Sequence, residues 1–311
     1  MYLAGAGVAF FGIIRADQRH LKLIPPDGHG FAKGKADPLP FQVSRNPEAV
    51  LRMAQHDPSD DRLYGDAELA QFYDLDNGWG ADLEYCRHMA STARSVLDLG
   101  CGTGRFAATL AEERLSRNDI DITAVDPAAA MLDIARHRPG GGHVRWIEDD
   151  ARSLRLGRQF DLVLLTGHAF QVFLTDEDQL AVLQTIATHL TPGGRFIFDS
   201  RNPVVAEWRG WLPEQTERQL QHPQLGTIKA WNDRSHDAAT GIVTYETYYQ
   251  CLSDHEVFFA SSRIAFPSQD HLARMMELAG LTVETWLGNW QGDAYGATSP
   301  DIIPIGRQNR L

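Results

Sequence analysis

The run VLDLGCGTGRF, residues 96–106, contains the residues whose types and spacing could most directly do chemistry. Apolar positions carry Asp98 into Gly100, Gly102 and Gly104, and a helical pattern follows. Glycine allows the backbone conformations that a sharp strand-to-helix turn needs, and its missing side chain lets a ligand approach the backbone closely. The run therefore predicts a nucleotide-binding loop.

The spacing of the glycines distinguishes between kinds of nucleotide. A dinucleotide-binding loop has the pattern G-x-G-x-x-G, whereas this chain has G-x-G-x-G followed directly by Arg105. The Asp98 carboxylate would repel a diphosphate and attract a sulfonium or ammonium group. A cationic nucleoside is therefore the expected ligand, and an NAD-dependent oxidoreductase is disfavoured.

This segment resembles motif I of the class I S-adenosylmethionine-dependent methyltransferases, and the resemblance extends from about Leu63 to the C-terminus. It implies an α/β fold: a doubly wound, Rossmann-like sheet of seven strands with the last strand antiparallel. It also implies S-adenosylmethionine as the cofactor. In this loop the cofactor would contact Asp98, Gly100, Cys101, Gly102 and Gly104.

The next apolar run, residues 121–136, ends its expected strand at Asp126. A carboxylate at the end of the second strand can accept both ribose hydroxyls, and the resemblance implies that role for Asp126. Met131 follows in the opening turn of the next helix, where similar enzymes place an apolar side chain on the adenine. An ordinary core methionine is the alternative.

A third matching stretch, residues 144–154, closes a short strand on three acids. The resemblance implies that Asp150 receives the adenine amino group and that the backbone N–H of Ala151 meets a ring nitrogen. The alternative is a solvated loop and helix N-cap. Glu148 and Asp149 are expected at the surface.

The fourth expected strand lies within residues 159–173 and has Thr166 and His168 at its carboxyl end, where open α/β sheets hold their ligands. Thr166 is a further cofactor candidate. His168 would lie beside the methyl group and could act as a general base, although a structural hydrogen-bonding role is the alternative. Gln171 could face the substrate or cap a helix.

The remaining elements of the sheet follow in order. In residues 190–203 a helix ends, Pro192 and the pair Gly193–Gly194 turn the chain, and a fifth strand runs to Asp199. Residues 267–308 predict an amphipathic helix, a strand, a loop and a last strand. Before the glycine-rich loop, a helical lead-in carries Tyr73 and Trp79, and similar enzymes fold this segment over the methionine end of the cofactor, where aromatic faces suit a sulfonium.

Residues 204–266 are an addition that the bare fold does not require. The segments 226–236, 241–251 and 255–266 alternate polar and apolar residues, which predicts a three-stranded antiparallel sheet. In similar small-molecule methyltransferases an insertion at this point arches over the active site and shapes the acceptor pocket. Sheet packing is the alternative for each acceptor candidate: Trp231, Tyr245, Tyr248, Tyr249 and Arg263.

Composition limits the partners. The 311 residues, 43% of them hydrophobic, suffice for one large α/β domain, and the net charge of −12 gives no attraction to a phosphate backbone. Three cysteines without a CxxC pair favour a reducing cytoplasm, and the 12 histidines lack metal-ligand spacing. We expect a cytoplasmic protein with a small-molecule acceptor and no nucleic acid, membrane or metal partner. Monomer and homodimer stay open.

The chain is expected to divide into an N-terminal extension, residues 1–60, and a methyltransferase domain, residues 61–311. Residues 1–14 are apolar but too short to span a membrane, and they lack the basic start of a secretory signal. Residues 15–60 are rich in Pro, Gly and charge, which predicts a mobile linker.

Two functions are compatible with these patterns. The first is an enzyme that transfers a methyl group in line to N or O of a small molecule. The second is a cofactor-binding sensor without turnover. Enzymes that methylate nucleobase amino groups or amides usually carry an Asn/Asp-Pro-Pro-aromatic motif after strand four. This chain has TGHAF there, which disfavours those acceptors.

Overall fold

The structure is a computed structural model that describes residues 65–116 and 119–309. Its larger sheet contains the strands β1 (Ser95–Leu99), β2 (Asp121–Asp126), β3 (Arg145–Glu148), β4 (Phe160–Leu165), β5 (Leu190–Phe198), β11 (Leu281–Leu287) and β12 (Asp301–Gln308). They lie in the order β11-β12-β5-β4-β1-β2-β3, and the two-residue β6 (Ser200–Arg201) extends the pairing with β12. Strands β1 to β5 are parallel, whereas β12 runs antiparallel to β5 and β11. The predicted doubly wound sheet with an antiparallel last strand is confirmed.

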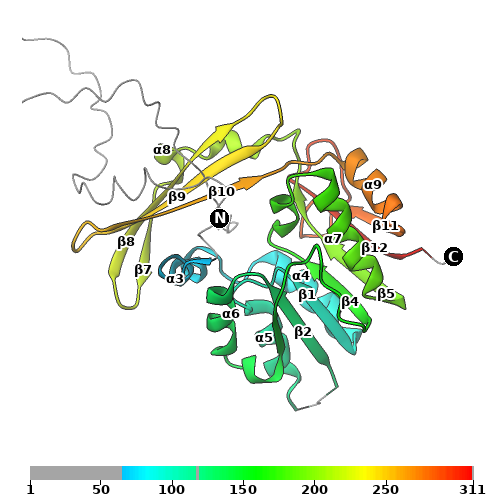
Figure 1. The fold of residues 1–311 in the computed structure, drawn as a ribbon. Coiled ribbons are helices and arrows are strands. Elements are labelled where there is room, and N and C mark those ends of the chain that lie inside the picture. The colour runs from blue at the N-terminus through cyan, green and yellow to red at the C-terminus, as the bar shows by residue number, and fades with distance from the viewer. Residues whose placement is uncertain (1–64, 117–118, 310–311) are drawn as a thin grey trace, which may run out of the picture.

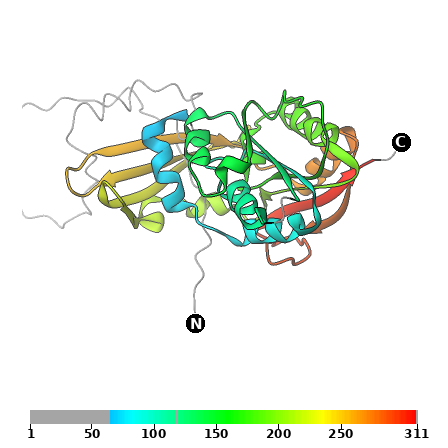
Figure 2. The same cartoon turned by 90° about the horizontal axis from the view of Figure 1, so that it is seen from below.

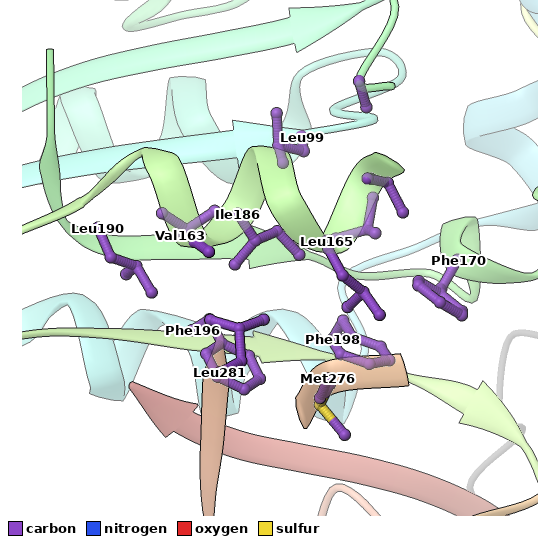
Figure 3. Packing of buried hydrophobic residues seen from close by; sticks show 14 of the residues in the cluster. Leu99, Val163, Leu165, Phe170, Ile186, Leu190, Phe196, Phe198, Met276 and Leu281 are labelled. Carbon is purple, nitrogen blue, oxygen red and sulfur yellow. The ribbon is translucent and has the colours of Figure 1, made fainter. Parts of the chain in front are cut away.

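Helices cover both faces of this sheet. On one face lie α4 (Ala81–Met89) and α5 (Arg105–Arg114), and their side chains form one core with alternate residues of the central strands. On the other face α7 (Asp176–Thr188) and α9 (Gln269–Leu278) pack on Val163, Leu165, Phe196 and Phe198, as Figure 3 shows. Because the central strands are buried on both faces, they are continuous apolar runs in the sequence.

The fifth strand differs from its prediction. Pro192, Gly193 and Gly194 do not turn the chain before the strand, because Leu190 already pairs with Phe160 of β4. The next pairs join Leu162 to Arg195, so these residues form an irregular stretch inside β5. A Pro-Gly-Gly sequence therefore signals a local break in pairing here rather than a strand boundary.

A second, smaller sheet follows β6. It consists of β7 (Arg218–His222), β8 (Gly226–His236), β9 (Val243–Cys251) and β10 (Val257–Ile264), antiparallel throughout in the order β10-β9-β8-β7. Figure 1 shows it beside the larger sheet, at the upper left. The prediction of three strands was wrong by one, because β7 is short and reads RQLQH, with a single apolar residue to mark the alternation.

Helix α3 (Ala67–Asp76) lies between the two sheets and is the expected lead-in helix. Its Leu69 and Phe72 belong to the core of the small sheet, whereas its Ala70 packs with Ala128 and with Met131 of α6 (Ala129–Arg136). In the view of Figure 2 the helix crosses the strands of the small sheet. One helix thus contacts both halves of the molecule.

The expectations for residues 1–60 lie outside the described residues. Within the described part of the chain, none of the helices combines the length and the apolar character needed to cross a membrane.

Candidate functional site

The glycine-rich loop after β1 has the backbone that its sequence predicts. Gly102 and Gly104 have φ values of +52° and +68°, in the left-handed region that favours glycine. At Gly104 a Cβ would lie 2.4 Å from Trp146 and 2.6 Å from Ala135, whereas at Gly102 the nearest atoms within 4 Å belong to the ring of Tyr73, at 3.8 Å. Gly104 therefore allows Trp146 and Ala135 to pack closely against the loop. Gly102 leaves a bare backbone on the part of the loop that faces Tyr73.

A polar network that the sequence patterns do not reveal holds this loop to α3. The hydroxyl of Thr103 donates a hydrogen bond of 2.8 Å to Asp74. Arg138 donates to the Thr103 carbonyl oxygen at 2.6 Å and to its hydroxyl at 2.9 Å, and also pairs with Asp74. Arg105, the residue after the last glycine, approaches the same carboxylate to 3.1 Å. The alternation of glycines gave no signal for these partners, because they come from separate elements.

Asp126, at the end of β2, accepts two backbone hydrogen bonds. Gly102 donates to Oδ2 at 2.8 Å and Ala128 to Oδ1 at 2.9 Å. Burial raises the pKa of this carboxyl, and the two hydrogen bonds act against that rise. Since a carboxylate has about four acceptor positions, each oxygen keeps a lone pair for a further donor such as a hydroxyl.

Asp98 lies inside the sheet, near the end of β1, and its side chain is 3% exposed. Burial and the neighbouring Asp126 raise the pKa of Asp98 to about 7, and no donor among the described residues offsets this rise. A buried carboxylate without a counter-charge is costly, so the site favours a ligand that brings positive charge.

Two cofactor candidates on either side of the loop are packed together. Met131 is fully buried, and Tyr73 packs against the cluster that Met131 forms with Ala70 and Ala128. Burial and the nearby Asp126 raise the pKa of Tyr73, so its hydroxyl stays protonated. The Tyr73 ring lies over the glycine-rich loop, since it would be 3.8 Å from a Cβ at Gly102. Met131 fills the space between α3 and α6. Contact of Met131 with an adenine stays a prediction.

The other loop candidates differ in their surroundings. Cys101 is partly buried, and burial and Asp98 raise the pKa of its thiol, which agrees with a small space-filling residue and not with a nucleophile. Trp79 is 38% exposed and donates a hydrogen bond to Glu84, so it packs at the surface. Gly100 has a φ of +63°, and a Cβ at this position would lie 3.3 Å from Ala169 and 3.4 Å from Leu165.

Asp150 follows β3 and is bound by Arg152. The guanidinium donates to both carboxylate oxygens and holds the pKa of Asp150 below its usual range. It also donates to Asp178 in the first turn of α7. Glu148 and Asp149 are exposed, as expected. Ala151 packs into the core of the sheet. The adenine contacts of Asp150 and Ala151 stay predictions.

His168 lies in the loop after β4, between carboxylates from two further strands. Its backbone N–H donates to Oδ1 of Asp199 at 2.9 Å, and its Nε2 lies 3.0 Å from Oδ1 of Asp301 and 3.5 Å from Oδ2 of Asp199. Burial raises the pKa of Asp199 to about 6, and the neighbouring His168 acts against the rise. Asp199 directly follows β5 and Asp301 begins β12.

This grouping is not visible in the sequence patterns. Asp199 marks only a strand end there, and Asp301 is 133 residues from the histidine. Thr166, just before His168, is partly buried at the end of β4. Within the described ranges no three His, Cys, Asp or Glu side chains form a group that could hold a metal ion.

The side chain of Gln171 has a bridging position that neither of its two predicted roles describes. It is fully buried, donates to the carbonyl oxygen of Ala265 at 2.7 Å and accepts from Arg201 at 2.9 Å. It therefore joins the loop after β4 to the end of β10 and to β6.

The acceptor candidates of the small sheet lie on two different faces. Tyr245 belongs to the core that contains Phe72 of α3, so it faces the rest of the molecule. Trp231 stacks on Tyr248, and Tyr248 donates a hydrogen bond to Glu246. By strand alternation and register these residues lie on the opposite face, as does Arg263. The five predicted acceptor residues are therefore divided between two faces, with Tyr245 and Tyr249 on the face toward α3 and Trp231, Tyr248 and Arg263 on the other.

Two residues outside the predictions fix the small sheet to α3. Asp76, the last residue of that helix, accepts a hydrogen bond of 2.9 Å from Tyr249 and is bound by Arg218 through Nε at 2.7 Å. Together with Asp74, it makes the C-terminal end of α3 a junction between the loop and the small sheet.

Known methyltransferases are similar to this chain in sequence. Residues 96–194 match a family model described as a methyltransferase domain. A cypemycin N-terminal methyltransferase of a Streptomyces species is 26% identical over 252 residues, which cover 79% of this chain and 98% of that protein. A dTDP-3-amino-3,6-dideoxy-alpha-D-glucopyranose N,N-dimethyltransferase of Streptomyces fradiae is 27% identical over 245 residues, 72% of this chain and 88% of that protein.

Solved structures support the fold. The CcbJ methyltransferase of Streptomyces caelestis superimposes with a TM-score of 0.64 at 21% identity, and the match covers 81% of this chain and all of that one. At this identity the likeness concerns the fold alone. The predicted resemblance to methyltransferases is confirmed.

Proposed function

We propose that this chain, whose residues 96–194 match a methyltransferase domain, transfers the methyl group of S-adenosylmethionine to a nitrogen or oxygen atom of a small molecule. The observation that carries the proposal is the Asp126 carboxylate, which holds Gly102 of the glycine-rich loop and keeps lone pairs for two hydroxyls. When bound, S-adenosylmethionine supplies an electrophilic methyl group, whose bond to sulfur breaks with the electron pair left on sulfur.

The residues present fit such a cofactor. Asp126 would hold the ribose, and the bare backbone at Gly102 would let the nucleoside approach. The buried Asp98 would face the positive charge of the methionine end. Tyr73 lies over the same loop, where its ring would exclude water. Asp150 and Ala151 after β3 would meet the adenine.

His168 is the proposed general base. Its side chain is 20% exposed at the carboxyl edge of β4, and carboxylates that can stabilise an imidazolium lie beside it. The chain would otherwise act by binding and aligning the two reactants and by excluding water from them. Alignment alone can lower the activation barrier of a two-substrate reaction by roughly 7–11 kcal/mol.

The names of the relatives support a small acceptor. One relative is named for methylation at an N-terminus and another for N,N-dimethylation of an amino sugar, and the second name places its methyl groups on nitrogen. No comparison favours a sensor without turnover. We further propose that residues 61–311 form the catalytic unit, with residues 204–266 shaping the acceptor pocket, and that the protein acts in the cytoplasm without nucleic acid.

Calorimetry with S-adenosylmethionine tests the cofactor site. Asp126→Ala and the milder Asp126→Asn are expected to weaken binding at least tenfold, because the ribose loses its acceptor. Asp121→Asn is the matched control, since Asp121 begins the same strand at the surface and pairs with Arg158. Unchanged affinity in both Asp126 variants would remove the site assignment.

Turnover is tested by incubating the full chain with methyl-labelled S-adenosylmethionine and a metabolite extract. A labelled product is expected, and its identity gives the acceptor. Binding of the cofactor without transfer to any extract would favour the sensor. Once an acceptor is known, normal turnover by His168→Ala would exclude the histidine from catalysis.

A further inference from the structure

The imidazole of His168 has two different sides. Nε2 faces Oδ1 of Asp301 at 3.0 Å and Oδ2 of Asp199 at 3.5 Å. No group among the described residues forms a hydrogen bond with Nδ1, and the side chain is 20% exposed. One ring nitrogen is therefore enclosed by carboxylates while the other is left for a ligand.

This enclosure determines where a neutral imidazole carries its proton. A carboxylate accepts hydrogen bonds and does not donate them, so Nε2 must carry the hydrogen in order to bond to Asp301. Nδ1 then has the free lone pair. The backbone of His168 is also fixed in place. Its N–H donates to Asp199, and the residue adopts a φ of +59°, which non-glycine residues rarely have.

We propose that Asp301 is a positioning residue which, with Asp199, keeps the proton of His168 on Nε2, so that Nδ1 takes a proton from an acceptor that arrives as a protonated amine. This inference rests on the proposed methyl transfer and names the acceptor class for it. It also assigns a role to the first residue of the antiparallel last strand.

The charges around the histidine favour a cationic acceptor. Asp199 comes from β5, Asp301 from β12, and Asp82 of α4 contributes a further negative charge that acts on Asp199. The cation on the adjoining β6, Arg201, interacts with Gln171 and Glu207. A carboxylate or phosphate on the acceptor would be repelled by three aspartates, whereas an ammonium group would be attracted.

The acidity of the acceptor group also favours an amine over a hydroxyl. An alkylammonium has a pKa of about 10, so it is a far stronger acid than a neutral hydroxyl, whose pKa of about 16 is comparable to that of water. A hydroxyl would therefore lose its proton to an imidazole only together with its attack on the methyl group, whereas an ammonium can lose its proton beforehand. In the proposed step one N–H bond of the ammonium breaks and an Nδ1–H bond forms. The nitrogen lone pair is then free to form the bond to the methyl carbon, and the imidazolium returns its proton to water.

The first test needs no acceptor. In the full chain labelled with ¹⁵N-histidine, two-bond ¹⁵N–¹H correlation spectra distinguish a protonated ring nitrogen from a bare one, and the spectrum of His168→Gln identifies the signals that belong to His168. Hydrogen on Nε2 in the neutral ring is the expected result. Hydrogen on Nδ1 in the wild-type protein would overturn the inference while leaving the cofactor site untouched.

Variants then test the carboxylate. Asp301→Asn is expected to raise the Nδ1–H population and to slow methyl transfer about 100-fold, with the calorimetric affinity for S-adenosylmethionine unchanged. Asp293→Asn is the matched control, because Asp293 lies in the same terminal segment and bonds to Asn289. An unchanged tautomer and rate in Asp301→Asn would reject the positioning role. The wild-type spectrum decides the tautomer even if that variant folds poorly.

The labelled product of the extract experiment tests the acceptor class. A methylated amine, retained on a cation exchanger at acidic pH, is expected. A methyl ether or ester would overturn the amine assignment while supporting the proposed methyl transfer. A cofactor-bound protein with no product would instead count against the proposed function, and the NMR result would still stand by itself.

Discussion

The hydroxyl of Thr103 donates a hydrogen bond of 2.8 Å to the carboxylate of Asp74, and this contact joins the glycine-rich loop to α3. Arg138, just beyond the C-terminal end of α6, binds both partners. Two residues later on α3, Asp76 binds the small sheet. The conformation of the loop that would hold the cofactor is therefore linked through one helix to the sheet that would shape the acceptor pocket.

Loss of the Asp74 carboxylate should weaken cofactor binding. In Asp74→Asn the charge-assisted hydrogen bonds to Thr103 and Arg138 are lost, and such bonds contribute about 1.5–3 kcal/mol. We expect the affinity for S-adenosylmethionine, measured by calorimetry, to fall about tenfold. Asp133→Asn is the control, since Asp133 pairs with Arg136 on the exposed side of α6. Equal affinities in the two variants would contradict the link.

Binding of S-adenosylmethionine should depend on pH through Asp98. With the pKa of Asp98 raised to about 7, the free protein carries a neutral carboxyl below that pH, and a cationic ligand favours the ionised form. Calorimetric affinity should therefore rise with pH between about 6 and 8 and level off above. In Asp98→Asn the affinity should be weaker and should lose this dependence. A wild-type affinity that falls over the same range would contradict the role.

Asp98 should also make the ligand-free protein less stable at alkaline pH. Its folded-state pKa lies above the unfolded value of 3.8, so the folded state holds the proton more tightly. The stabilisation from this proton is complete below the unfolded pKa and is lost as pH rises through about 7. Asp98→Asn should therefore raise the melting temperature more at pH 8 than at pH 5. The opposite order would indicate that the pKa of Asp98 is not raised in the folded protein.

Gly104 should not tolerate a side chain. In Gly104→Ala the Cβ would collide with Trp146 and Ala135 at a φ of +68°, and we expect a loss of about 2–4 kcal/mol in the free energy of unfolding. Gly142→Ala is the matched control, because nothing lies within 4 Å of its Cβ position and its φ is not positive. Thermal unfolding measures both. Similar stability in the two variants would contradict the packing.

Phe72 should anchor the small sheet to α3. It is fully buried and stacks on Tyr249 with ring centroids 4.5 Å apart. Phe72→Ala should lower the free energy of unfolding by about 3–5 kcal/mol, as large core deletions do. Denaturant titration measures this loss. Val204→Ala, at a site that is 72% exposed, should cost almost nothing, and an equally small effect at Phe72 would contradict the anchoring.

The sequence predicted the parts of the site that depend on neighbours in the chain. The glycine-rich loop, Asp98 and the position of Asp126 at the end of β2 follow from apolar strand patterns and turn residues, and these patterns act over about ten residues. The order of strands and helices can also be predicted from the sequence, because strands that are buried on both faces are mostly apolar.

The partners of His168 could not be predicted in this way. Asp301 comes from β12 and Asp199 from β5, and only the pairing of β12 beside β5 brings the two carboxylates to one imidazole. The faces of the small sheet are a similar case. Tyr245 and Tyr248 look equivalent in an aromatic-rich segment, yet strand alternation places them on opposite faces, and which face meets α3 depends on tertiary packing.

By itself, then, the sequence determined a methyltransferase-like sheet, its nucleotide-binding loop and the histidine after β4. The tertiary structure alone decided that α3 joins loop and small sheet through Asp74 and Asp76, and that His168 presents Nδ1 because Nε2 faces carboxylates. The physical reason is the distance along the chain over which each effect acts. Backbone propensity and hydrophobic periodicity are local properties of the chain, whereas charge pairing and burial are set by segments that meet only when the sheet assembles.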